Sequence, residues 1–285
     1  MFVTYAQDFR RSRNVSVRDT VQEPSAYFRR ATEALEDERR RVEEEQAAFE
    51  AFGDAVADLD GPESERPTDV PGTPERCLEP LTVTDGGRTG SATRVEELYR
   101  ETVLETASAN EFDETVAEHM AEEFGAEVYR AVFGGSVLGL RLRSALVEGA
   151  RAAIRERQEI IGRIERERRA LTDAQNRLED ISDERRDLHP GRDSISLGRL
   201  YSRRNRVLEL RDSCDELAAD RQRSLEVTLY DDYQYRSFVR YLYRRCSFGF
   251  PILSGAAALA ASLRETRTRI DDRIVETSDE GPHNA

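Results

Sequence analysis

One long stretch without proline, from about Val137 to Leu188, constrains the fold of this chain more than any other feature. Apolar residues keep helical spacing throughout it, so it predicts a single helix of about 78 Å, at about 1.5 Å per residue. In its second half the apolar side chains repeat every seven residues, as they do in a coiled coil. One seam position holds Ile164, Leu171 and Leu178, and the other holds Ile160, Ala174, Ile181 and Leu188. Such a helix needs a partner helix to bury its seam.

The partner follows directly in the sequence. His189-Pro190-Gly191 ends the first helix, because proline disfavours helical backbone at the residue before it and glycine permits chain reversal. The return helix, about 195–227, has a heptad seam of its own, formed by Leu200, Val207 and Cys214 with Leu210 and Leu217. Two long helices joined by a short turn pack antiparallel. Residues 137–227 are therefore predicted to form a long antiparallel coiled-coil hairpin.

Residues 25–60 are predicted to form a third helix of this bundle. Phe28, Leu35, Val42, Phe49 and Val56 recur every seven residues, while Glu38 and Glu45 interrupt the second apolar series. The seam of a two-helix hairpin is too narrow to be fully buried, so we expect this first helix to close the core. Residues 1–24 show no sustained periodicity and are predicted to be an irregular arm. Residues 61–90 contain repeated prolines and a Gly-Gly pair, which predict a linker.

The remaining segments are predicted to form a helical head at one end of the hairpin. Its first part is 91–136, and its second part is 228–275, which is rich in aromatic residues and then in alanine. Residues 276–285 are predicted to be a disordered tail. The expected fold class is all-α, an elongated antiparallel helical bundle or coiled-coil hairpin with a small helical head.

The charged residues point to a salt-rich environment. All 43 basic residues are arginine, and 57 carboxylates give a net charge of −14. In molar salt the Debye length shrinks to about 3 Å, which screens the self-repulsion of such a chain. This acidic, lysine-free composition resembles that of proteins from halophilic archaea. The first 21 residues lack the apolar segment of a signal peptide, so we expect a cytoplasmic protein.

The residue types present argue against several kinds of enzyme. Without lysine there is no phosphate-binding P-loop and no Schiff-base chemistry. The histidines are His119, His189 and His283; His119 shares a helical face with Glu122 and Glu123 but lacks the second Glu-x-x-His helix of a di-iron site. Cys77, Cys214 and Cys246 lie far apart and are expected to be reduced thiols. We therefore expect no enzyme activity, no catalytic residue, no cofactor and no metal.

Two segments are candidates for binding. Arginines recur on one face of a predicted helix beside tyrosines, and the possible partner-binding residues are Tyr233, Arg236, Arg240, Tyr241 and Arg244. This composition can stack on nucleic-acid bases, but we favour a solvated face whose arginines pair with neighbouring carboxylates, because molar salt weakens phosphate binding. The second segment, residues 246–263, has 18 residues without charge. Its proline, glycines, serines and alanines favour a buried helix over a membrane anchor or span.

The chain also resembles an uncharacterised haloarchaeal family of helical, coiled-coil-containing domains of unknown function. The resemblance covers about residues 25–265 and rests on four segments: 31–38, Ala48-Phe49 with Phe52, Leu98-Tyr99-Arg100-Glu101-Thr102-Val103, and Tyr241-Leu242-Tyr243 with Phe250-Pro251-Ile252-Leu253. It implies a single helical unit and no activity. The leading hypothesis is a non-enzymatic interaction or scaffold protein that binds a protein partner or a second copy through its coiled coil. The alternatives are a nucleic-acid-associated regulator that uses the Arg/Tyr face and a peripheral membrane protein, although the arguments above weigh against both nucleic acid and membrane as partners.

Overall fold

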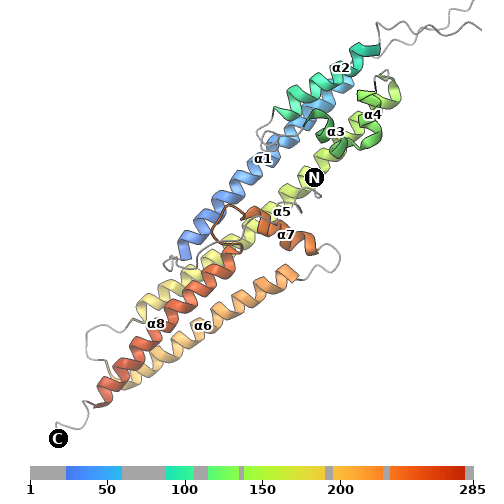
Figure 1. The fold of residues 1–285 in the computed structure, drawn as a ribbon. Coiled ribbons are helices and arrows are strands. Elements are labelled where there is room, and N and C mark those ends of the chain that lie inside the picture. Colours follow the sequence, from blue (N-terminus) through green and yellow to red (C-terminus); the bar gives the residue numbers. More distant parts are fainter. Residues whose placement is uncertain are drawn as a thin grey trace, which may run out of the picture. The chain divides into compact units, whose positions relative to one another are not determined.

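The computed structural model describes residues 24–59, 88–105, 115–134, 138–189, 195–226 and 232–279, and within these ranges every regular element is a helix. The all-α prediction is confirmed. The elements are α1 (Pro24–Asp58), α2 (Arg88–Tyr99), the π-helix η3 (Arg100–Leu104), α3 (Val116–Phe124), α4 (Ala126–Phe133), α5 (Leu140–Asp187), α6 (Leu197–Glu226), α7 (Asp232–Leu242) and α8 (Pro251–Asp279) (Figure 1).

The helices belong to two compact units, and two of them contribute to both. Of the described residues, the first unit takes those within 39–162, and the second takes 24–38 and those from 163 onward. Helices α1 and α5 therefore each supply one half to each unit. The sequence grouped 91–136 and 228–275 into one head, but the structure divides them differently. Helices α2, α3 and α4 belong to the first unit, whereas α7 and α8 belong to the second.

In the second unit, α5 and α6 form the predicted antiparallel hairpin. Three ion pairs join the helices, Glu167–Arg221, Arg177–Glu216 and Glu184–Arg206, and the residue numbers rise along α5 as they fall along α6. The predicted seam is inside, since the side chains of Ile164, Leu171, Leu178, Leu200, Val207 and Cys214 are all at most 1% exposed. The predicted turn at Pro190 lies outside the described residues.

Helices α1 and α8 also pack in the second unit. The aromatic ring of Phe28 from α1 and the side chain of Leu178 from α5 both lie against Gly255 of α8. A Cβ atom at Gly255 would stand 2.8 Å from the Phe28 ring, so the missing side chain lets α1 approach α8 closely. The first helix is thus a bundle member, as predicted.

Helix α8 runs antiparallel beside α6 (Figure 1), and Arg204 and Asp271 form an ion pair between them at 2.8 Å. Its buried residues continue at helical spacing through Leu259, Leu263 and Ile270, so α8 is a bundle helix rather than part of a separate head. It also extends to Asp279. The tail predicted from residue 276 therefore begins with helical residues.

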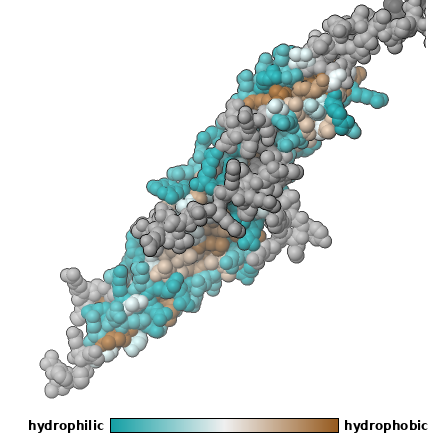
Figure 2. Space-filling model, viewed as in Figure 1, coloured by the Kyte–Doolittle hydropathy of each residue, from teal (hydrophilic) through white to brown (hydrophobic). Residues whose placement is uncertain are grey.

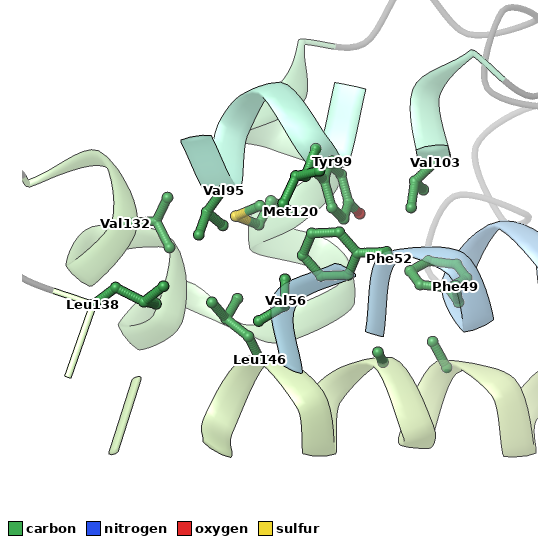
Figure 3. Close-up of a cluster of buried hydrophobic side chains, with 13 residues drawn as sticks. Phe49, Phe52, Val56, Val95, Tyr99, Val103, Met120, Val132, Leu138 and Leu146 are labelled. Carbon is green, nitrogen blue, oxygen red and sulfur yellow. The ribbon is translucent and has the colours of Figure 1, made fainter. Parts of the chain in front are cut away.

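The first unit packs α2, α3 and α4 around halves of α1 and α5. Its core joins Phe49, Phe52 and Val56 of α1 to residues of the other helices (Figure 3). Gly125 ends α3 and separates it from α4 with a φ of +86°, a conformation that side chains rarely adopt. Helix α4 ends before Gly134.

Parts of several predicted segments lie outside the described residues, among them most of the 1–24 arm, residues 61–87 of the linker together with Cys77, and the last residues of the tail. Residues 88–90 of the predicted linker belong to α2, which begins at Arg88. Helix α3 begins at Val116, because Thr115 caps it. The Thr115 hydroxyl accepts a hydrogen bond from the Glu118 backbone N–H, and the Glu118 carboxylate accepts one from the Thr115 N–H.

Candidate interaction surface and buried polar networks

The predicted partner-binding residues lie on and just after α7. Tyr233, Arg236, Arg240 and Tyr241 belong to the helix, and Arg244 lies in the turn that follows it. The three arginine side chains are all exposed, as expected from their spacing of four residues on one helical face. The side chain of Tyr233 lies outside the described part of the structure. We call Arg236, Arg240, Tyr241 and Arg244 the α7 arginine face.

Aromatic rings and one carboxylate fix parts of this face. The Arg244 guanidinium stacks over the Tyr241 ring at 3.7 Å and donates a hydrogen bond to the Tyr241 carbonyl at 3.1 Å. It also pairs with Glu38 of α1 at 3.6 Å. The Arg236 guanidinium lies 6.0 Å from the centre of the Phe250 ring. Stacked guanidinium groups keep N–H donors at their edges, so this face can still bind carboxylates or phosphates.

A buried carboxylate holds α7 in place. Glu167 of α5 is fully buried, and its two oxygens accept hydrogen bonds from Arg221 Nη2 at 2.6 and 2.7 Å. The hydroxyls of Tyr243, at 2.9 Å, and Tyr235, at 3.1 Å, also donate to Glu167. These four residues, the Glu167 network, join α5, α6, α7 and the turn after it.

The environment of the Glu167 network shifts the ionisation of its members. Burial, followed by the negative charge of Glu167, raises the pKa values of Tyr243 and Tyr235. Burial alone would lower the pKa of Arg221, but the charge and hydrogen bonds of Glu167 raise it instead. The network therefore consists of one ion pair and two neutral hydroxyls at neutral pH, with its charges balanced.

A second buried network lies in the first unit around Arg157 of α5, whose side chain is 1% exposed. Arg157 Nη2 and Nη1 donate to the two oxygens of Glu123 in α3 at 2.6 and 2.9 Å, and its Nε donates to Glu45 of α1 at 3.3 Å. The guanidinium also lies over the Phe49 ring, 4.7 Å from its centre. Arg41 pairs with Glu45 at 3.6 Å. The Arg157 network thus alternates two positive and two negative groups across three helices.

His119 links this network to α2. Its Nδ1 atom lies 2.7 Å from the Tyr99 hydroxyl, and Tyr99 is fully buried. Burial lowers the pKa of His119 and outweighs the opposing attraction of Glu123. Burial would raise the pKa of Glu123, yet the hydrogen bonds and charge of Arg157 lower it overall. His119 thus contacts Tyr99, and Glu123 is hydrogen-bonded to Arg157.

Both networks occupy positions where a coiled-coil seam normally holds apolar residues. Glu45 was visible in the sequence as an interruption of the seam. Arg157 and Glu167 were not singled out as seam residues, although each continues the heptad series of α5, seven residues before Ile164 and seven before Ala174. Arg221 likewise follows Cys214 by seven residues in α6. A charged residue in a seam position was therefore the signal that could have located these networks.

The structure also places two of the cysteines, His189 and the arginines on the flanks of the hairpin. Cys214 is buried in the α6 seam, and burial raises the pKa of its thiol to about 11. Cys246 is a free, half-buried thiol, and Cys77 lies outside the described residues. His189 Nε2 lies 2.8 Å from Arg269 Nη1. On the hairpin flanks, Arg168 pairs with Glu165, and Arg206 pairs with Glu184 and Glu209.

The described residues contain neither a metal-binding cluster nor a membrane-spanning helix. No three His, Cys, Asp or Glu side chains in these ranges come together in a way that could hold a metal ion. Among the helices that the structure describes, none combines the length and apolar content that crossing a bilayer requires. In residues 246–263, the side chains of Phe248, Ile252, Leu259 and Leu263 are buried in the second unit.

Comparison with known proteins decides the family. A family model described as Domain of unknown function (DUF7260) matches residues 26–267. The chain belongs to this family. The DUF7260 match begins in α1 and ends inside α8, so it includes both networks and the α7 arginine face. Membership confirms the resemblance to a family of unknown function. Neither curated proteins nor solved structures gave a match to the chain.

Proposed function

We propose that this DUF7260 chain is a non-enzymatic interaction or scaffold protein that binds a protein partner through the α7 arginine face. The observation that carries the proposal is the contrast between interior and surface charges. In both units buried charged groups pair across helices, as Glu167 does with Arg221 and Arg157 does with Glu123. The buried Glu38 instead pairs with Arg244, a member of the α7 arginine face. Such pairing fixes helix positions. It also occupies the buried carboxylates, which are therefore not available as general acids or bases.

The α7 arginine face differs from these interior groups. Arg236 and Arg240 are exposed, and the helix that carries them is held rigidly from below by Val239, Leu242 and Tyr243, which are all at most 3% exposed. A rigid helix with a regular row of guanidinium groups fits a carboxylate-bearing helix of a partner, because arginine binds carboxylates through two parallel hydrogen bonds. Aromatic rings beneath arginines are also common where proteins bind one another.

The proposed environment is the cytoplasm of a halophilic archaeon. Its support is the sequence: arginine replaces lysine throughout, and the net charge is −14. In such salt the exposed ion pairs of the hairpin flanks contribute little, since they lie in screened solvent. A partner contact must then rest on close hydrogen-bonded and stacked groups, which the α7 arginine face supplies.

Pull-down of partners from a native extract in about 3 M KCl tests the proposal, with partners identified by mass spectrometry and confirmed by sedimentation with purified proteins. The double variant Arg236→Glu and Arg240→Glu should lose the partner. The matched control is Arg199→Glu, because Arg199 is an exposed arginine near the start of α6, 22 residues before Arg221 of the Glu167 network. A compact monomer without any co-purifying protein, or equal loss with the control, would contradict the proposal.

The nucleic-acid alternative rests on the same exposed arginines beside aromatic rings. Glu38 weakens it, because this carboxylate sits 3.6 Å from Arg244 and would face the phosphates. An electrophoretic mobility shift assay with single- and double-stranded DNA and RNA at native salt distinguishes a nucleic-acid partner from a protein partner. Saturable binding that Arg236→Glu and Arg240→Glu abolish would favour nucleic acid over a protein partner.

A further inference from the structure

Helix α3 is short and is anchored by one face. At nine residues it is below the length at which an isolated helix is stable in water, so its contacts with neighbouring helices hold it in the helical state. His119, Met120, Glu123 and Phe124 are its four anchors, and their spacing places them on one side of the helix. Two of the anchors are apolar, and two are titratable.

The apolar anchors cover an aromatic cluster. Met120 is fully buried among residues of α1 and α2 (Figure 3). The Phe124 ring lies 5.7 Å from both the Phe52 and Tyr99 rings and 6.3 Å from the Phe49 ring. Phe124 also packs against the backbone of α5 at Gly149, where a Cβ atom would stand 2.2 Å from the ring. Release of α3 would therefore uncover Phe49, Phe52 and Tyr99.

The titratable anchors set the conditions for release. In the neutral tautomer that carries its proton on Nε2, His119 Nδ1 accepts a hydrogen bond from the Tyr99 hydroxyl across 2.7 Å. A proton on Nδ1 turns that acceptor into a donor and forces the buried hydroxyl to reorient. The second anchor, Glu123, is already occupied by two hydrogen bonds from Arg157.

The groups around His119 come from four helices. Tyr99 faces it from α2, Glu122 and Glu123 from α3 itself, and Arg157 from α5. Beyond Arg157 lie Glu45 and Arg41 of α1, which pair with each other. The carboxylates favour an imidazolium, but burial opposes it more strongly and Arg157 adds repulsion, so the pKa of His119 is lowered.

We propose that α3 is a pH-sensitive cover of the aromatic cluster, which loosens when His119 takes up a proton. Because the pKa of His119 in the packed state lies below its ordinary value of 6.5, released α3 binds a proton more readily than packed α3. The contact therefore has its full stability above pH 6.5 and weakens as the pH falls below that value. One proton changes the opening equilibrium by up to about tenfold per pH unit.

Hydrogen exchange of the full chain, measured by mass spectrometry at pH 7.5 and 5.5 in constant molar KCl and corrected for intrinsic exchange rates, tests this. We expect α3 amides to open up to about tenfold more at pH 5.5, while amides in the middle of α6 remain unchanged. Glu123 stays ionised in this range, because its pKa is lowered from 4.5.

Two variants make the test specific. His119→Asn keeps an acceptor near the position of Nδ1 but cannot take up a proton, so its α3 should exchange equally at both pH values. His189→Asn is the matched control in the second unit and should keep the pH response of α3. Equal exchange of wild-type α3 at both pH values, or a pH response that persists in His119→Asn, would overturn the proposal.

The asparagine variant could itself unseat α3 at both pH values. In that event, an NMR titration of wild-type His119 decides, with its resonance assigned by its loss in the variant. A pKa below 6.5 supports the proposal, and a pKa at or above 6.5 refutes it.

Discussion

Replacing Glu167 with leucine should destabilise the second unit far more than replacing any exposed carboxylate. The change leaves Arg221 charged and only 6% exposed, without the oxygens that accept its hydrogen bonds. Breaking a buried pair by removing one partner costs about 3–5 kcal/mol. The Tyr243 hydroxyl loses its acceptor too, which adds about 1–3 kcal/mol. The loss is thus about 4 kcal/mol or more, against a typical total stability of about 5–15 kcal/mol.

Urea unfolding followed by far-UV circular dichroism measures this loss. At an m value of about 3 kcal/mol per M, a loss of 4 kcal/mol lowers the midpoint by about 1.3 M. The matched control is Glu165→Leu on the same helix, where the carboxylate is 25% exposed and pairs with the exposed Arg168. It should cost less than about 1 kcal/mol.

The double variant Glu167→Leu and Arg221→Leu separates charge from packing. It removes both charges, so it should regain about 3 kcal/mol relative to Glu167→Leu and keep only the cost of the unsatisfied hydroxyls. Two results would refute the reasoning: a loss for Glu167→Leu no larger than for Glu165→Leu, or a double variant less stable than Glu167→Leu.

Three further outcomes are expected from the structure. Gly149→Ala should lower the melting temperature, because its new Cβ would stand 2.2 Å from the Phe124 ring, whereas Gly198→Ala, with no atom within 4 Å, should leave it unchanged or raise it. Arg157→Met should cost about 3–5 kcal/mol in urea unfolding, because Glu123 keeps its charge in a buried site. Cys214 should resist a thiol-alkylating reagent at pH 8 in peptide-mapped mass spectrometry until the protein unfolds, because it is buried and its thiol pKa is about 11.

The heptad repeat predicted the hairpin correctly because a seam can be read directly from spacing. Ile164, Leu171 and Leu178 face the partner helix wherever the chain turns back, and the short turn leaves only an antiparallel arrangement. The same repeat in residues 25–60 identified α1 as a bundle helix. Periodicity shows which face of a helix is buried, but not which neighbouring helix it packs against. For this reason the sequence predicted α8 to lie in a head, whereas the structure places it in the bundle. Its alanines indicated a separate head element, whereas Gly255 lets α8 approach α1 and α5, and α8 also packs beside α6.

The candidate surface was predicted from residue types, and its partners were not. Spacing alone places Arg236, Arg240 and Arg244 on one face. Arg244 and Glu38 are 206 residues apart in the sequence, and their ion pair depends on the position of α1 in the bundle. The buried networks raise the same difficulty. A charged seam residue can be recognised in the sequence. Its partner cannot, because Arg157 pairs with Glu123 only when α3 packs against α5.

The salt dependence of stability should differ between the exposed and the buried ion pairs of this chain. The comparison of Glu165→Leu with Glu167→Leu tests this difference when it is repeated at several KCl concentrations. The Arg168–Glu165 pair has one partner 48% exposed, so its contribution should vanish as KCl rises from about 0.1 to 3 M and the Debye length falls from about 10 Å toward 3 Å or less. Glu167 and Arg221 are shielded from mobile ions, so the cost of Glu167→Leu should stay nearly constant over this range. If the loss of stability falls with rising KCl in parallel for Glu165→Leu and Glu167→Leu, the Glu167 network is in contact with solvent. With a constant cost, the interior pairs are the charges that still distinguish correct from incorrect helix pairing in molar salt, where surface charges have lost that ability.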